Sequence, residues 1–119
     1  MIKTSSSKIY DLESRTYEFA KGCREFVKQL PKTIANIEDG KQLIRSSGSV
    51  AANYIEANES LSRKDFAMRV KISRKEIKES RFWLSLSEPS NEQCEERKFL
   101  IVESTELMKI FGSIVEQLK

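Results

Sequence analysis

The sequence predicts an all-α protein, an antiparallel up-down-up-down four-helix bundle. Only two prolines and four glycines occur in 119 residues, too few for the many turns of a β-sandwich or barrel, whereas 33% of the residues are charged. Apolar residues recur at steps of three and four, as on one face of an amphipathic helix. Two capping-box patterns mark further helix starts. This length suits one domain, and four helices joined by short connections favour a bundle.

The first helix is expected to cover residues 9–30, because Pro31 ends it. The small, polar residues 1–8 before it are expected to form a flexible N-terminus, which leaves residues 9–119 as the single bundle domain. The apolar positions of this helix are Ile9, Leu12, Phe19, Ala20, Cys23, Phe26, Val27 and Leu30.

Residues 32–40 are interpreted as a connection, in which Asp39-Gly40 is a turn signal. The second helix is then expected over residues 41–58. Its expected core positions are Ile44, Ala51 and Ile55.

The third and fourth helices are predicted from their caps. Ser62 followed by Asp65 favours a helix over residues 63–87, and Ser90 followed by Gln93 opens another that runs to the C-terminus. The expected core positions of the third helix are Phe66, Val70, Ile77 and Leu84. Those of the fourth follow an alternating four-three spacing and are Leu100, Ser104, Leu107, Phe111, Ile114 and Leu118.

Composition argues against an enzyme. There is no histidine, which removes the usual general base and the imidazole metal ligand. Cys23 and Cys94 have no CxxC spacing, so we expect two buried, reduced thiols, with a disulfide as the alternative. The Ser-x-x-Lys match at residues 5–8 has no supporting site. We therefore expect no cofactor and no metal.

The termini and apolar runs bear on location. No apolar run approaches the roughly 18 residues of a membrane span, and residues 1–7 lack the apolar core of a signal peptide. We expect a cytoplasmic protein without membrane contact.

The second helix carries an unusual polar stripe within a sector of about 80°. It consists of Gln42, Arg45, Ser49, Asn53 and Glu56. The residues beside it are small, which lets another backbone approach closely. Two interpretations follow, a tight helix crossing within the chain or an interface between subunits.

The third helix is the basic segment of a chain whose net charge is only +3. Between residues 63 and 88 lie eight basic and four acidic residues. The basic strip consists of Arg63, Lys64, Lys71, Arg74, Lys75, Lys78 and Arg81. One interpretation is a solvated face stabilised by pairs of Glu76 with Arg69 and of Glu79 with Lys75. The other is phosphate contact with RNA or DNA, which salt would weaken steeply.

A second, apolar side of the same helix is formed by Met68, Ile72 and Trp83. An isolated bundle would leave this side exposed, which is a reason to expect a partner. The candidate subunit-interface residues are therefore Gln42, Arg45, Ser49, Asn53, Glu56, Met68, Ile72 and Trp83.

Specific polar residues carry a family resemblance. Residues 40–57 read GKQLIRSSGSVAANYIEA, followed by SRKDF at 62–66 and SRKEIKES at 73–80. With YDLE at 10–13 and LPK at 30–32, the chain resembles, over residues 9–88, the bacterial four-helix-bundle proteins first noticed as reading frames in intervening sequences of 23S ribosomal RNA genes. The fourth helix is similar only in being amphipathic.

The resemblance implies a ring-like homopentamer related to the accessory variability determinant proteins of diversity-generating retroelements, basic pentamers that associate with a reverse transcriptase and with nucleic acid. The biochemical role of the intervening-sequence branch itself is unassigned. The positions that match the family's polar motifs are Gln42, Arg45, Ser49, Asn53, Glu56, Lys64, Phe66 and Glu76. The chain departs from the pattern at residues 53–57, where many relatives read NIAEG, and at Arg15, where many carry tryptophan.

We therefore expect a non-enzymatic, cytoplasmic homo-oligomer, a pentamer, whose basic third helix contacts RNA or other nucleic acid. The alternative is a protein-interaction scaffold or accessory subunit, for example of a reverse transcriptase, without nucleic-acid binding of its own.

Overall fold

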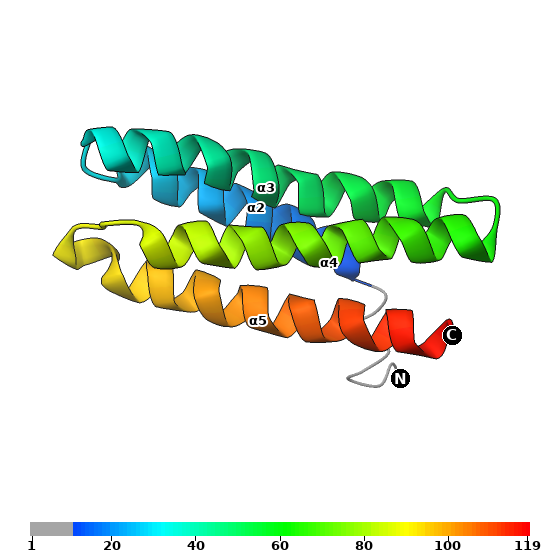
Figure 1. Ribbon diagram of the computed structural model, residues 1–119. Helices are drawn as coiled ribbons and strands as arrows, with labels where there is room; N and C mark the ends of the chain where they lie inside the picture. The colour runs from blue at the N-terminus through cyan, green and yellow to red at the C-terminus, as the bar shows by residue number, and fades with distance from the viewer. Residues whose placement is uncertain (1–10) are drawn as a thin grey trace.

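The computed structural model describes residues 11–119, which form α-helices and no strand. The elements are α2 (Leu12–Gln29), α3 (Ile34–Asn58), α4 (Arg63–Leu86), the short 3-10 helix η1 (Asn91–Gln93) and α5 (Cys94–Gln117). Successive helices run in opposite directions and are joined by short turns at alternate ends (Figure 1). The predicted all-α bundle is confirmed, while the expected flexible segment 1–8 and the core position Ile9 lie outside the described residues.

The core follows the spacing of a coiled coil in all four helices. Steps of three and four separate the buried positions, so that one stripe of each helix faces the bundle axis. The stripe of α2 is fully buried and includes Leu12, Phe19, Cys23 and Phe26, as expected. The stripe of α4, with Val70, Ile77 and Leu84, is also confirmed.

The start of α3 differs from the sequence prediction, because residues 34–40 are helical rather than a connection. Thr33 is the N-cap, and its Oγ1 accepts a hydrogen bond of 3.1 Å from the backbone N of Asn36. Gly40 is buried inside the helix, where an added Cβ would lie 2.9 Å from Cγ1 of Val27. This glycine therefore permits close packing of α2 on α3 and does not form a turn.

The buried face of α3 is also rotated from the predicted one. Leu43, Val50 and Tyr54 are buried, whereas Ile55 is 49% exposed. The predicted positions lie about 100° around the helix from this face. Because α3 packs between α2 and α4, its buried face is centred on the positions that point between these two neighbours.

Two buried side chains tie together the loops at one end of the bundle. Nδ2 of Asn36 donates to the carbonyl oxygens of Pro31 and Glu88 at 3.0 and 2.9 Å, and its Oδ1 accepts from the backbone N of Glu88 at 3.0 Å. Gln93 completes the predicted capping box with Ser90, and its Nε2 donates to the carbonyl of Phe26 at 2.9 Å. These bonds hold the α2–α3 loop against the α4–α5 connection.

The remaining differences concern the ends of helices. Ser62 caps α4 as predicted, because its Oγ accepts from the backbone N of Asp65 at 3.0 Å. In the last turns of α5, Val115 is buried, whereas the predicted Ile114 and Leu118 are only half-buried. None of the helices within residues 11–119 is both long and apolar enough to cross a membrane.

Candidate functional site

Small residues bring α3 and α4 into close contact. Oγ of Ser46 lies 2.9 Å from Oγ of Ser80, and Oγ of Ser73 donates to the carbonyl of Val50 at 3.0 Å. These serines are fully buried. Their hydroxyls form hydrogen bonds with one another or with the backbone. Among the described residues, no buried side-chain nitrogen or oxygen lacks a hydrogen-bond partner. The structure thus shows the tight crossing within the chain that the polar stripe allows.

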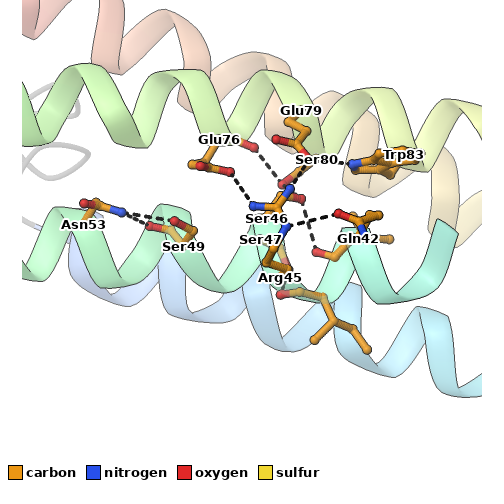
Figure 2. A network of polar contacts seen from close by, with 12 residues as sticks. Gln42, Arg45, Ser46, Ser47, Ser49, Asn53, Glu76, Glu79, Ser80 and Trp83 are labelled. Carbon is orange, nitrogen blue, oxygen red and sulfur yellow. Dashed lines mark hydrogen bonds and ion pairs between the residues drawn. The ribbon is translucent and has the colours of Figure 1, made fainter. Parts of the chain in front are cut away.

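A network of charged groups covers the outer side of this crossing (Figure 2). Arg45 of α3 donates through Nε to Oε1 of Gln42 at 3.1 Å, and its guanidinium forms ion pairs with Glu76, at 3.4 Å, and with Glu79. Oε2 of Glu79 also accepts from Nε1 of Trp83 at 2.9 Å. The network joins the predicted stripe of α3 to the side of α4 that carries Trp83.

The same side of the pair continues through Asn53. Its Nδ2 donates to the carbonyl of Ser49 at 2.9 Å and to Oγ of that residue at 3.1 Å, and its Oδ1 accepts from Nη1 of Arg69 at 2.9 Å. The predicted pairs of Glu76 with Arg69 and of Glu79 with Lys75 are therefore wrong, because α3 supplies the partners of these side chains.

The structure brings together most of the candidate subunit-interface residues on this α3/α4 face. Glu56 and Met68 are exposed there, the latter by 51%, and Ile72 is half-buried. Trp83 differs from the expectation, because it is half-buried and packs against the hydrophobic core. The role of this face in subunit contact stays a prediction.

Sequence reasoning missed the exposed apolar residues next to Trp83. The ring of Phe82 lies edge-on to that of Trp83, with centroids 4.8 Å apart, and is 54% exposed. Leu86, one turn further along α4, is 49% exposed. Phe82 lies four residues after Lys78 and seven after Lys75, and Leu86 lies four after Phe82. This spacing puts both apolar residues near these lysines on α4 and could have been recognised in the sequence.

An adjoining, exposed part of α4 carries four cations without acidic partners. Within residues 11–119, no ion pair involves these side chains, although all are exposed. They line a surface hollow of about 390 Å³ and are Lys71, Arg74, Lys75 and Lys78. We call these four residues the basic face. The sequence predicted all four as candidate nucleic-acid contacts.

The other predicted basic residues occupy the borders of this surface. Nη1 of Arg81 donates to Oγ1 of Thr105 on α5 at 3.2 Å, and Nη2 of Arg63 donates to the carbonyl of Gln117 at 3.4 Å. These two arginines therefore hold α5 against α4. Lys64 is exposed in the first turn of α4.

A groove of about 770 Å³ between α4 and α5 adjoins the basic face. Arg74 and Lys78 line both hollows. The wall on α5 was not predicted and includes Met108, Lys109, Gly112 and Ser113. An added Cβ on Gly112 would lie 3.7 Å from Cζ and Nε of Arg74, so the guanidinium lies over the bare backbone of α5. Lys109 and Gly112 are three residues apart, so the sequence already places them on one face of α5.

Comparison with known proteins places the chain in a family. The family model described as "23S rRNA-intervening sequence protein" matches residues 9–112. The chain belongs to this family. The match covers most of α5, and so extends beyond the residues 9–88 that carried the resemblance. No curated protein matches the chain.

A solved structure has a similar fold. The chain is similar to a crystal structure of a protein with unknown function from the S23 ribosomal protein family of Bacteroides thetaiotaomicron VPI-5482. The two are 29% identical with a TM-score of 0.74, and the match covers 87% of this chain and 96% of that one. The similarity therefore includes nearly the whole bundle.

An ion pair joins Arg15 of α2 to Glu103 of α5. Nε and Nη2 of Arg15 donate to the two carboxylate oxygens of Glu103 at 3.1 and 2.7 Å. Both side chains are about four-fifths buried, and the hydrogen bond to Glu103 raises the pKa of Arg15. The pair links α2 to α5, the adjacent helices with the least extensive contact.

The two cysteines are free and differ in environment. Cys23 is fully buried in the core, where desolvation raises the pKa of its thiol to about 12. Cys94 is exposed at the start of α5, which corrects the expectation that both thiols are buried. In the described part of the chain, no three His, Cys, Asp or Glu side chains are placed to hold a metal ion.

Proposed function

We propose that this member of the family is a non-enzymatic, cytoplasmic homo-oligomer, a pentamer, that binds nucleic acid through the basic face. The observation that supports nucleic-acid binding is the separation of charge on α4. Glu76 and Glu79 of α4 pair with Arg45 on α3, and the four cations of the basic face have no acidic partner within residues 11–119.

This separation decides what the basic face can do. If Glu79 paired with Lys75 along the helix, the charges of α4 would largely cancel at short range. Because Glu76 and Glu79 pair with Arg45 instead, these carboxylates do not bind the four cations, which can contact a ligand. Phosphate groups are the acceptors that Lys and Arg side chains bind in nucleic acids, and their contacts are mainly independent of base sequence.

Charge reversal tests this part of the proposal. The variant carrying Lys71→Glu and Lys75→Glu is compared with one carrying Lys21→Glu and Lys41→Glu, which changes the net charge equally at exposed positions on α2 and α3. Fluorescence anisotropy with mixed-sequence RNA at low salt measures binding. We expect the first variant to lose at least tenfold in affinity and the second to change it by less than threefold. Equal losses, or no binding by the parent protein, would refute nucleic-acid binding through this face.

The proposal of a pentamer is supported by the family resemblance and by the exposed residues of the α3/α4 face. Small and apolar side chains such as Ala52 and Met68 are exposed there beside the ion-pair network. Light scattering over a range of concentrations measures the mass in solution. We expect about five times the chain mass of 13.7 kDa. A monomer at every concentration would refute the oligomer.

The second candidate is a protein-interaction scaffold or accessory subunit. It is favoured by the exposed apolar side chains of Phe82 and Leu86 at the end of α4. The experiments above separate the two functions, because a scaffold would form the oligomer and show no salt-dependent affinity for RNA.

A further inference from the structure

The two hollows beside α4 form one continuous surface with two different parts. The smaller part is lined by cations alone, the four residues of the basic face. The larger part, between α4 and α5, adds the cations Arg81 and Lys109 at its sides and an uncharged floor made by Met108, Gly112 and Ser113. A ligand that fits both must carry a row of anions beside a less polar group.

The cations on α4 form the row. Lys71, Lys75 and Lys78 are four and three residues apart, so their Cα atoms follow one another at about 6 and 4.5 Å along the helix axis. Long flexible side chains at these steps can contact successive phosphates of an extended strand. Glu116 is the acidic residue of the larger part, and its carboxylate pairs with Lys119 at 3.0 Å.

Arg74 and Gly112 define the place for the less polar group. The guanidinium of Arg74 lies against the position where Gly112 lacks a side chain, and Met108 is one helical turn away on α5. Unpaired bases stack on guanidinium planes, and this recognition requires bases that are turned out of a helix. A base inside a duplex is covered by its neighbours and cannot enter the groove.

We propose that the α4/α5 groove binds single-stranded nucleic acid, with its phosphates on the basic face and an unpaired base stacked on the face of the Arg74 guanidinium that is turned away from Gly112. This inference rests on the proposed nucleic-acid binding and names the form of the ligand. It assigns a binding role to α5, and in particular to Gly112.

Substitutions at Gly112 test the groove without changing the charge. Gly112→Leu fills the floor, whereas Gly112→Ala places a methyl group at an ordinary contact distance of 3.7 Å from Arg74. Anisotropy is measured with a labelled 12-nucleotide single strand, as RNA and as DNA, and with the duplex of the same sequence. We expect the parent protein to bind a single strand at least fivefold more tightly than the duplex. Gly112→Leu should weaken single-strand binding about tenfold and leave duplex binding unchanged, while Gly112→Ala stays within twofold of the parent protein.

A second variant guards against misfolding of the first. Arg74→Lys keeps the charge and removes the planar group, and we expect a loss of about threefold to tenfold for the single strand alone. Circular dichroism checks that both variants keep the helical fold.

The failures of the two proposals are distinguishable. Equal affinity for single strand and duplex, or single-strand binding unaffected by both Gly112→Leu and Arg74→Lys, overturns the groove while the proposed function stands. Absence of binding to any of the nucleic acids, or binding unaffected by the double charge reversal at Lys71 and Lys75, overturns the proposed function and the groove with it.

Discussion

Arg45 on α3 forms an ion pair with Glu79 on α4, and the same carboxylate accepts the indole N–H of Trp83 at 2.9 Å. One arginine thus joins the two helices through ion pairs with Glu76 and Glu79, and the Glu79 carboxylate also binds the single tryptophan of the chain. The cations of the basic face are therefore not the partners of Glu76 and Glu79.

We expect Arg45→Gln to lower the free energy of unfolding by about 0.5 to 1 kcal/mol, since the ion pairs are half-exposed and solvent screens them. The emission of Trp83 should also change, because Glu79 loses its cation. Urea unfolding followed by fluorescence measures both effects. Lys41→Gln, which breaks the exposed pair with Glu38, is the control and should change neither by a measurable amount. Equal effects of the two variants would contradict the role of Arg45.

The two glycines of α3 should respond in opposite directions to alanine. Gly40→Ala is expected to destabilise the protein by about 1 to 3 kcal/mol, because its Cβ would meet Cγ1 of Val27 at 2.9 Å. Gly48→Ala is expected to stabilise it by about 0.5 to 1 kcal/mol, because nothing lies within 4 Å of the added Cβ. Thermal and urea unfolding measure both.

The double variant Gly40→Ala with Val27→Ala tests whether the steric clash with Val27 causes the loss of stability in Gly40→Ala. Shortening Val27 removes the atom that the new Cβ meets, so the double variant should lose less stability than the sum of the single variants. Strict additivity would show that Gly40 does not set the distance between α2 and α3.

We expect Asn36→Ala to lower the free energy of unfolding by about 2 to 4 kcal/mol. The substitution removes three hydrogen bonds and leaves the backbone N–H and C=O of Glu88 and the C=O of Pro31 without this partner in a part-buried site. Urea unfolding measures the loss. Asn58→Ala removes an exposed hydrogen bond to Glu13 and should change stability by less than about 0.5 kcal/mol. A similar effect of both variants would exclude the loop tie as a main source of stability.

Stability should fall at alkaline pH through Cys23. Its pKa is about 12 in the folded protein against an ordinary value of 9.0, so above pH 9 the unfolded chain releases the thiol proton and the folded one keeps it. The unfolded state then binds fewer protons, and the free energy of unfolding decreases as pH rises, by roughly 1 kcal/mol at pH 10.

The variant Cys23→Ala tests this dependence of the free energy of unfolding on pH, which we call the pH slope. It should lower stability at pH 7 and show a smaller further loss up to pH 10 than the parent protein. Burial also raises the pKa of Tyr54, but that contribution is common to both proteins and cancels. Cys94→Ala, at an exposed site, should keep the parent slope. An unchanged slope in Cys23→Ala would contradict the assignment.

The sequence by itself determined the fold class, the family and most of the core. Heptad spacing located the buried stripes of α2 and α4, because each helix must turn its apolar positions toward the axis wherever its neighbours lie. Ser62 and Ser90 marked helix starts because a capping bond is formed within a few residues. Local patterns suffice for features with local causes.

The tertiary structure decided the features that depend on two elements at once. Asp39-Gly40 looks like a turn in sequence, but Gly40 serves the contact with Val27, a residue of another helix. Glu79 has Lys75 one turn away, yet its partner is Arg45 across the helix crossing. The groove in the same way requires Arg74 of α4 to meet Gly112 of α5. These contacts join residues that are far apart in the chain, because the geometry of helix packing, and not the spacing along one helix, determines which side chains meet.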